Sequence, residues 1–390
     1  MQFLLNLLSL AAVVYAQETN NPTCDTSADG ITNSLLYTAG FAAEVPQVCV
    51  QATGQQGGLR CFHVYVPDCA EADSPLVFDI HGYDSCPLFN TAYTGWMALA
   101  RDNCFVLLMP LGTLDPEIAE GTCWSAPGGM PVGDGSVSDG CCCNKDNVLT
   151  DPAVTNDADL MRIMAKTATE QIPVATGGKV TIDTKRIYMA GHSNGCLESL
   201  AVAALHSDMV AAVCCHAGVA VTDFAADYSA VPIWMVYGEK DDQWEVAGNN
   251  FPTPPAVYSS YADKNGCDAI ETVTPVSVEG AEVGSVKTRS NCDNGADVTV
   301  VALTESGHYP YKGFDELTEG ASSTTLDTTT MAWEFCSRFT KSEVPDLSGA
   351  NVEYLTYSPT VAPTISAAVA IKRTMVVQIV SIIAVSFVFM

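Results

Sequence analysis

The chain has 390 residues, 16 cysteines and a formal net charge of −28 at pH 7. Because acidic residues are spread along its whole length, we expect an acidic surface that repels phosphate polyanions, and we expect no nucleic acid partner. An even number of cysteines in a secreted chain predicts mostly disulfides. A zinc site is the alternative use of these thiols, but histidines are few, so we expect no metal and no cofactor.

The N-terminus has the pattern of a secretory signal. Residues 4–14 form a short apolar run that small residues close around Ala16, and the polar stretch 17–21 follows at once. Such a run is too short to span a bilayer and is typical of a signal peptide. We therefore expect cleavage that removes residues 1–16 and a single domain over residues 17–345.

Strand-like and helix-like segments alternate along this domain. Apolar runs rich in β-branched and aromatic residues predict buried strands at 61–66, 76–80, 105–109, 186–190, 209–215, 233–237 and 298–303. Helical spacing of apolar residues predicts helices at 93–101, 157–172, 197–206, 257–265 and 325–339. This alternation indicates an α/β fold, in which helices cover both faces of a mostly parallel sheet.

One segment departs from the alternation inside the domain. Residues 112–147 are rich in Gly, Pro, Ser and Cys, with Trp124 in their middle. This composition predicts a long, disulfide-stapled loop over the functional edge of the sheet.

The C-terminal part has the composition of a stalk and an anchor. Residues 346–374 contain many Ser, Thr and Pro residues, which predicts an extended linker, and residues 375–390 form an apolar tail. Lys372 and Arg373 precede the tail, on the side that would lie outside the cell. The pattern favours a GPI attachment signal with its site near residues 366–368, and a retained membrane anchor is the alternative.

The most informative motif is Gly-His-Ser-Asn-Gly at 191–195, between a predicted strand and a predicted helix. It fits the G-x-S-x-G pattern, in which a sharp turn exposes a serine hydroxyl at the top of the sheet. Glycines at both ends leave room where side chains would crowd the neighbouring strand and helix. Ser193 is therefore the candidate nucleophile.

A serine hydroxyl is a weak nucleophile, so it needs a histidine base and a carboxylate that orients the base. With this motif the order along the chain is serine, acid, histidine, and His308 is the histidine that satisfies it. The acid should follow the strand 233–237, where Asp241 and Asp242 are the candidates and Glu239 and Glu245 lie nearby. Adjacent residues point in different directions, so the residues alone leave Asp241, our choice, and Asp242 nearly equal.

Acyl transfer also requires N–H donors for the oxygen that becomes negatively charged in the transition state. The backbone N–H of Asn194, directly after the nucleophile, is the first candidate. The second should come from the loop His81-Gly82-Tyr83 after the strand 76–80, because glycine lets the main chain approach a substrate closely. We take the N–H of Tyr83 as this donor.

Taken in order, these motifs resemble the secreted esterase family that contains feruloyl esterases, acetylxylan esterases and polyhydroxybutyrate depolymerases. The likeness spans about residues 61–339 and rests on the strings 76–82, 109–112, 123–124, 140–142, 183–195, 232–238, 265–267 and 307–308. The resemblance implies an α/β-hydrolase fold, places the acid at Asp241 rather than Asp242, and implies a disulfide between Cys267 and Cys292. The sequence departs from the family after His308, where Tyr309 stands in place of a frequent threonine.

The resemblance implies hydrolysis of feruloyl or acetyl esters of polysaccharides, with polyester hydrolysis as an alternative that the sequence does not separate. The expected partner is thus an ester-bearing polysaccharide or a polyester, and a membrane only through the C-terminal tail. Trp124, Trp244, Tyr309 and Tyr311 are candidates for lining an aromatic acyl pocket, although scattered aromatics more often serve packing. A non-catalytic cell-surface protein is the alternative of another class, because a fold alone does not imply activity.

Overall fold

The structure is a computed structural model of the chain. It describes residues 47–52, 59–83, 85–114, 122–124, 130–131, 137–138, 157–219, 223–243, 252–314, 320–348 and 352–354. The predicted signal peptide, the apolar tail and most of the predicted loop at 112–147 lie outside these residues. Within the described ranges, no helix combines the length and the apolar character that a membrane crossing requires.

The described residues form one large sheet with the strand order β12-β13-β14-β11-β10-β9-β3-β4-β2-β1-β15. The strands are β1 (Gln47–Ala52), β2 (Leu59–Tyr65), β3 (Ser74–Ile80), β4 (Val106–Pro110), β9 (Ile182–His192), β10 (Ala212–His216), β11 (Ile233–Gly238), β12 (Glu271–Val278), β13 (Ala281–Arg289), β14 (Val298–Leu303) and β15 (Val352–Tyr354). The central strands, from β14 to β4, run parallel. Their carboxyl ends therefore meet at one edge of the sheet. Antiparallel strands extend it on both sides.

Short ribbons lie outside this sheet. They pair β5 (Thr113–Leu114) with β6 (Thr122–Cys123), and β7 (Met130–Pro131) with β8 (Val137–Ser138). All of them belong to the segment that the sequence predicts as a long loop.

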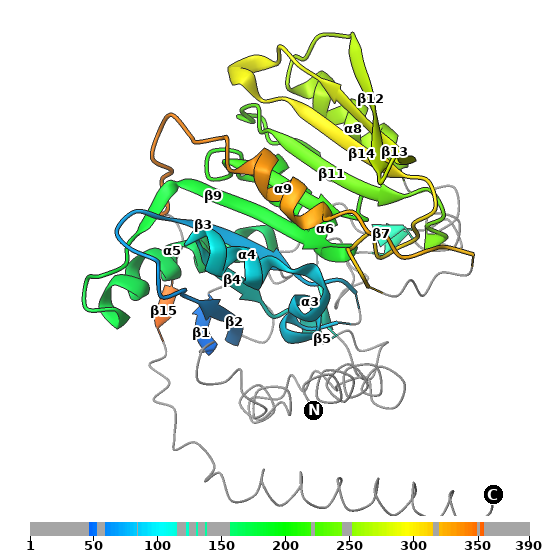
Figure 1. Cartoon of the computed structure of the whole chain (residues 1–390). Helices are drawn as coiled ribbons and strands as arrows, with labels where there is room; N and C mark the ends of the chain where they lie inside the picture. The colour runs from blue at the N-terminus through cyan, green and yellow to red at the C-terminus, as the bar shows by residue number, and fades with distance from the viewer. Residues whose placement is uncertain are drawn as a thin grey trace, which may run out of the picture.

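Helices cover both faces of the sheet (Figure 1). One layer contains α5 (Asp157–Ala175), α6 (Asn194–Leu205) and α8 (Pro254–Lys264), and the other contains α3 (Pro87–Thr94), α4 (Trp96–Asn103) and α9 (Thr328–Cys336). Successive strand residues alternate between the layers: Phe78 and Ile80 of β3 belong to the first core, and Val77 belongs to the second. This arrangement is the predicted α/β-hydrolase fold.

Strand β10 is joined by disulfides to a helix on each face. Cys214 and Cys215 are neighbours on the strand, so their side chains point to opposite faces. Cys215 is bonded to Cys196 of α6, and Cys214 is bonded to Cys336 of α9. Cys196, for which the sequence offers no explanation, therefore fixes the first turn of α6, directly after Ser193, to the sheet.

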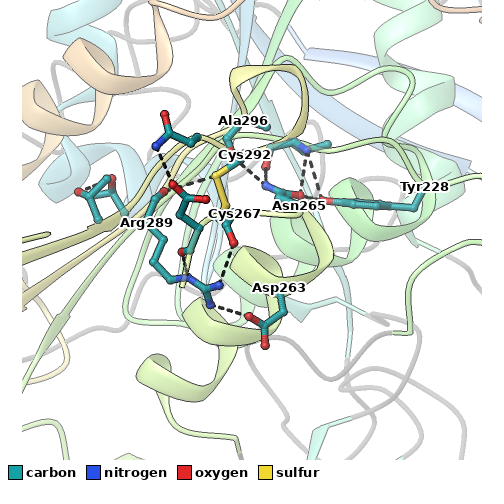
Figure 2. The surroundings of a disulfide bond; sticks show 12 residues. Tyr228, Asp263, Asn265, Cys267, Arg289, Cys292 and Ala296 are labelled. Atoms are coloured by element: carbon teal, nitrogen blue, oxygen red, sulfur yellow. Dashed lines mark hydrogen bonds and ion pairs between the residues drawn. A yellow bond between two sulfur atoms is a disulfide. The ribbon is translucent and has the colours of Figure 1, made fainter. Parts of the chain in front are cut away.

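The disulfide between Cys267 and Cys292, implied by the family resemblance, is formed in the structure (Figure 2). It joins the end of α8 to the turn η2 (Asp293–Gly295) before β14. Beside it, the amide of Asn265 donates to the carbonyl oxygens of Val231 (2.8 Å) and Ala296 (2.9 Å). These contacts anchor the amino end of β14, the strand that leads to His308.

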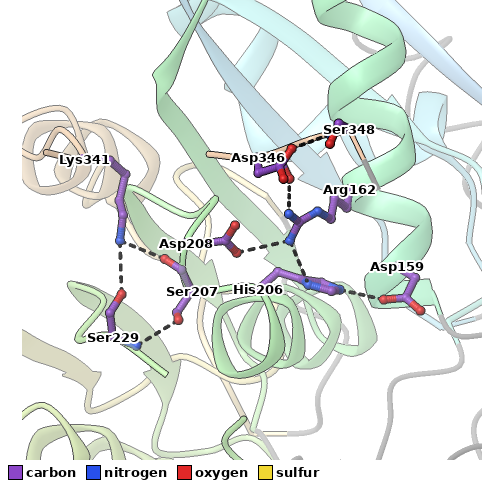
Figure 3. A network of polar contacts seen from close by, with 9 residues as sticks. All are labelled: Asp159, Arg162, His206, Ser207, Asp208, Ser229, Lys341, Asp346 and Ser348. Carbon is purple, nitrogen blue, oxygen red and sulfur yellow. Dashed lines mark hydrogen bonds and ion pairs between the residues drawn. The ribbon is translucent and has the colours of Figure 1, made fainter. Parts of the chain in front are cut away.

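A polar network fixes the chain near its C-terminal end, as Figure 3 shows. Arg162 of α5 contacts Asp208 (3.2 Å) and the main-chain oxygen of Asp346. Nε2 of His206, at the end of α6, lies 2.8 Å from Oδ1 of Asp159. The segment around residue 346 is thereby held against α5 and α6.

The structure differs from the predicted elements in several places, one of which is β1, a strand that the sequence does not predict. The predicted helix 93–101 covers most of α4 and only the last two residues of α3, and Gly95, whose φ of 77° ends α3, separates the two helices. The hairpin of β12 and β13 was not predicted, because its outer strand is exposed over residues 271–275 and contains Pro275. Residues 352–354 of the predicted stalk form β15 instead, which pairs with β1, so ordered structure continues past residue 345.

Candidate active site

Ser193 lies in the turn between β9 and α6, at the carboxyl edge of the parallel strands. Its φ of 55° is a strained value for a residue with a side chain, and its N–H donates to the oxygen of His216 at 2.9 Å. A Cβ atom at Gly191 would lie 2.4 Å from the oxygen of Gly195, and one at Gly195 would lie 2.0 Å from the oxygen of Ile80. Both glycines are thus required by the close approach of strand, turn and helix.

Ser193, His308 and Asp241 form a continuous hydrogen-bonded arrangement. Nε2 of His308 lies 2.9 Å from Oγ of Ser193, and Nδ1 of His308 lies 2.8 Å from Oδ2 of Asp241. Since an ionised carboxylate only accepts hydrogen bonds, Nδ1 carries the proton and Nε2 can accept the serine proton. This is the arrangement that an activated serine nucleophile requires.

The structure distinguishes the two neighbouring aspartates. The side chain of Asp241 is fully buried against His308, whereas Asp242 is exposed and contacts Gln243. Glu239 is exposed as well, and position 245 lies outside the described residues. Only Asp241 of the described candidates is therefore placed to orient the histidine.

A close contact between two loops brings the acid and the base together. A Cβ atom at Gly238, the last residue of β11, would lie 2.0 Å from the oxygen of Ser306. The N–H of Lys240 donates to that same oxygen at 3.0 Å. Glycine at this position thus lets the loop after β14, which carries His308, pack against the loop that carries Asp241.

The residues predicted to supply the oxyanion donors lie close to the nucleophile. Asn194 is the first residue of α6, whose free N–H groups make a helix start suited to negative charge. A Cβ atom at Gly82 would lie 3.4 Å from Cβ of Ser193, so the main chain before Tyr83 passes directly beside the serine. The structure therefore brings Asn194 and Tyr83 to the same edge as Ser193.

Trp124 connects these two loops, a role that sequence reasoning missed. Its backbone N–H donates to Oδ1 of Asn194 and its indole N–H donates to the oxygen of His81, each at 2.8 Å. Both Trp124 and Tyr311 are almost fully buried, so they serve packing rather than line an open pocket. Tyr309 is half-buried, and position 244 lies outside the described residues.

His216, next to the nucleophile's turn, provides a test of acid sensitivity. Its ring is fully buried and stacked on Tyr311 at 4.4 Å, and among the described residues neither ring nitrogen has a hydrogen-bond partner. Burial lowers the pKa of His216 to about 3. In the unfolded chain, His216 takes up a proton below about pH 6.5, whereas in the folded protein it stays neutral down to about pH 3. The contribution of His216 to the free energy of unfolding is therefore complete above about pH 6.5 and is lost as the pH falls towards 3.

His216→Phe should remove this loss and keep the stacked ring. Between pH 7 and pH 4, the free energy of unfolding of the variant should rise relative to wild type by about 3 kcal/mol, as urea unfolding at both pH values can measure. His63 and His81, which burial also keeps neutral, are present in both proteins and cancel in the difference. Parallel pH dependence of the two proteins would contradict the expectation.

Comparison with known proteins adds a distant likeness to esterases. No family model matches the chain. The chain is 24% identical over 262 residues to a bifunctional acetylxylan esterase/xylanase of Neocallimastix patriciarum, a match that covers 66% of this chain and 32% of that protein. The chain thus spans about a third of the length of this relative. The likeness agrees with the resemblance to acetylxylan esterases that the motifs predict.

Two solved structures show a distant similarity to this chain. One is an acetyl xylan esterase from Aspergillus awamori, with a TM-score of 0.49, 12% identity and coverage of 75% of this chain and 98% of that chain. Another is an S-formylglutathione hydrolase from Agrobacterium tumefaciens, with a TM-score of 0.35, 14% identity and coverage of 56% and 82%.

Proposed function

We propose that this chain is a serine carboxylic-ester hydrolase that works through an acyl-enzyme. The observation that carries the proposal is that His308 contacts the hydroxyl of Ser193 with one ring nitrogen and the buried carboxylate of Asp241 with the other. In the reaction, Oγ of Ser193 attacks the ester carbonyl carbon while its proton passes to Nε2 of His308. Asp241 stabilises the imidazolium that forms.

The second half of the reaction follows from the same residues. The N–H groups of Asn194 and Tyr83 stabilise the tetrahedral oxyanion, which collapses as His308 returns the proton to the leaving alcohol. Water, activated by His308, then hydrolyses the acyl group on Ser193 and regenerates the hydroxyl. No cofactor takes part in these steps.

For the substrate we propose an acyl ester of a neutral polysaccharide, with acetyl esters preferred to feruloyl esters. The acetylxylan esterase relative supports the acetyl group. The burial of Trp124 and Tyr311, which removes two candidate walls of an aromatic acyl pocket, supports a small acyl group. The net charge of −28 favours a neutral polymer over an anionic one.

A substrate panel tests this proposal. Purified protein should react with an active-site phosphonate probe at Ser193, and it should release acetate from acetylated xylan faster than ferulate from feruloylated arabinoxylan. Faster release of hydroxybutyrate from a polyester film would favour the depolymerase function instead. Failure of both labelling and hydrolysis would favour a non-catalytic surface protein.

We further propose that the protein is secreted and held on the outer cell surface by a GPI lipid. Residues 1–16 and 375–390, which carry the entry signal and the tail, support this from sequence alone. Phosphatidylinositol-specific phospholipase C should release active esterase from intact cells. Recovery of peptides from residues 376–390 in the mature protein would instead identify a retained membrane anchor.

A further inference from the structure

A chain of hydrogen bonds runs beneath the candidate active site and ends on the main chain of His308. In the structure, Nδ2 of Asn90 in α3 lies 2.8 Å from Oδ1 of Asp79 in β3, and Oδ1 of Asn90 lies 2.8 Å from the hydroxyl of Tyr93. That hydroxyl lies 3.0 Å from Nδ1 of His192, and Nε2 of His192 lies 2.8 Å from the main-chain oxygen of His308. The chain thus connects the centre of the sheet to the loop of the candidate base.

Every link of this chain is shielded from water. The exposed fractions are 0% for Asp79 and Asn90, 2% for His192 and 9% for Tyr93. The second carboxyl oxygen of Asp79 accepts from the hydroxyl of Thr94 at 2.9 Å. Because buried polar groups are costly when unpaired, donors and acceptors must match at each contact.

The position of each proton can be worked out from the last hydrogen bond of the series, between His192 and His308. A carbonyl oxygen can only accept, so Nε2 of His192 carries a proton. A neutral ring then accepts at Nδ1, and Tyr93 must donate its single proton there. The oxygen of Tyr93 must in turn accept from the amide N–H of Asn90.

The orientation of the Asn90 amide then sets the protonation state of Asp79. The structure has the opposite orientation, with Nδ2 towards Asp79 and Oδ1 towards Tyr93. The two ends of an amide have the same shape, so the hydrogen-bond network decides between the two orientations. With the N–H towards Tyr93, as the tautomer of His192 requires, the carbonyl oxygen of Asn90 faces Asp79. Two acceptors cannot pair, so the carboxyl group of Asp79 must be protonated and donate to this oxygen. The neutral chain therefore requires Asp79 in its acid form.

If the hydrogen bonds between Asp79 and His192 ran in the opposite direction, both of these residues would be charged. If Asp79 were ionised, Asn90 would donate to it and Tyr93 would donate to Asn90, so His192 would have to donate from both nitrogens and carry a positive charge. The ring of His192 lies 5.0 Å from that of His308, which itself becomes positive during catalysis. Burial, then the neighbouring His308, hold the pKa of His192 well below its usual range, and burial raises the pKa of Asp79 to about 7. These directions both favour the neutral chain.

We propose that His192 is a positioning residue for His308, and that a protonated Asp79, acting through Asn90 and Tyr93, keeps His192 in the tautomer that holds the His308 carbonyl. This inference rests on the proposed function. Asp241 fixes the ring of His308 and His192 fixes its main chain, so the base is held at two points. Holding a reacting group in place is worth large factors in rate, and a displacement of 1 Å costs about 10²-fold.

Paired variants at position 192 test the clamp, which is the hydrogen bond from Nε2 of His192 to the main-chain oxygen of His308. His192→Leu removes the donor and should lower kcat by about 10- to 10²-fold with little change in KM. His192→Gln, whose amide N–H can reach the same carbonyl, should restore most of that loss. His206→Gln, at the far end of α6, is the matched control and should keep wild-type kcat. If the glutamine and leucine variants at position 192 fold and are equally impaired, the clamp is refuted.

Paired variants at position 79 test the protonated carboxyl. Asp79→Asn reproduces one donor and one acceptor and should keep most of the kcat that Asp79→Leu loses. If both variants fold and Asp79→Asn loses as much kcat as Asp79→Leu, the ionised form of Asp79 is needed and the assignment is overturned.

Spectroscopy of the wild-type protein keeps the test independent of activity. Below pH 7, ¹⁵N shifts should identify His192 as a neutral Nε2–H tautomer, and infrared spectra should show a buried protonated carboxyl band that Asp79→Asn removes. A doubly protonated His192 would overturn the proposal. If wild type hydrolyses no ester but shows this tautomer, the proposed function fails while the hydrogen-bond chain stands.

Discussion

Ser193→Ala should abolish ester hydrolysis, with kcat lowered by about 10⁴-fold or more. The reason is that Ser193 supplies the oxygen that forms the acyl-enzyme, and this oxygen lies 2.9 Å from Nε2 of His308. The side chain of alanine is no larger than that of serine, so the turn, with φ of 55° at this residue, can keep its conformation. Initial rates on an aryl acetate measure the effect.

Controls separate lost chemistry from lost structure in this variant. The variant should melt at the wild-type temperature, and Ser259→Ala, on the exposed side of α8, should keep full activity. Retention of more than a few per cent of the rate in Ser193→Ala would place the nucleophile elsewhere.

Asp241→Asn should lower kcat by about 10⁴-fold, because an amide in place of the carboxylate no longer selects the Nδ1–H tautomer of His308. The hydrogen bond of 2.8 Å and the complete burial of the Asp241 side chain leave water no route to replace it. Measurement of kcat on the same aryl acetate, with KM determined separately, reports the loss.

Asp242→Asn is the matched control, since it makes the same chemical change one residue away. Its exposed side chain contacts Gln243 and not His308, so its kcat should stay within about twofold of wild type. Equal losses in the two variants would show that the acid has been assigned wrongly.

The buried parallel strands could be predicted because each is apolar on both faces. The run 298–303 coincides with β14, and the run 233–237 differs from β11 by one residue. The hairpin of β12 and β13 gives no such signal, because an exposed edge strand has no continuous apolar run. β15 is shorter still and exists only through its pairing with β1.

Local spacing by itself determined the nucleophile's turn. Gly191, Ser193 and Gly195 are close in sequence, and the steric demand of strand, turn and helix acts within that short span. The order of serine, acid and histidine likewise pointed to His308 and to the pair Asp241 and Asp242.

Only the tertiary structure decided which side chains meet across the sheet. It gave Cys196 its partner Cys215, and it set Trp124 between Asn194 and the loop of His81. Each of these contacts joins segments far apart in the chain. The periodicity of apolar residues reports which face of an element is buried, but not which residue of another element lies opposite, because that depends on strand order, register and the close approach of loops.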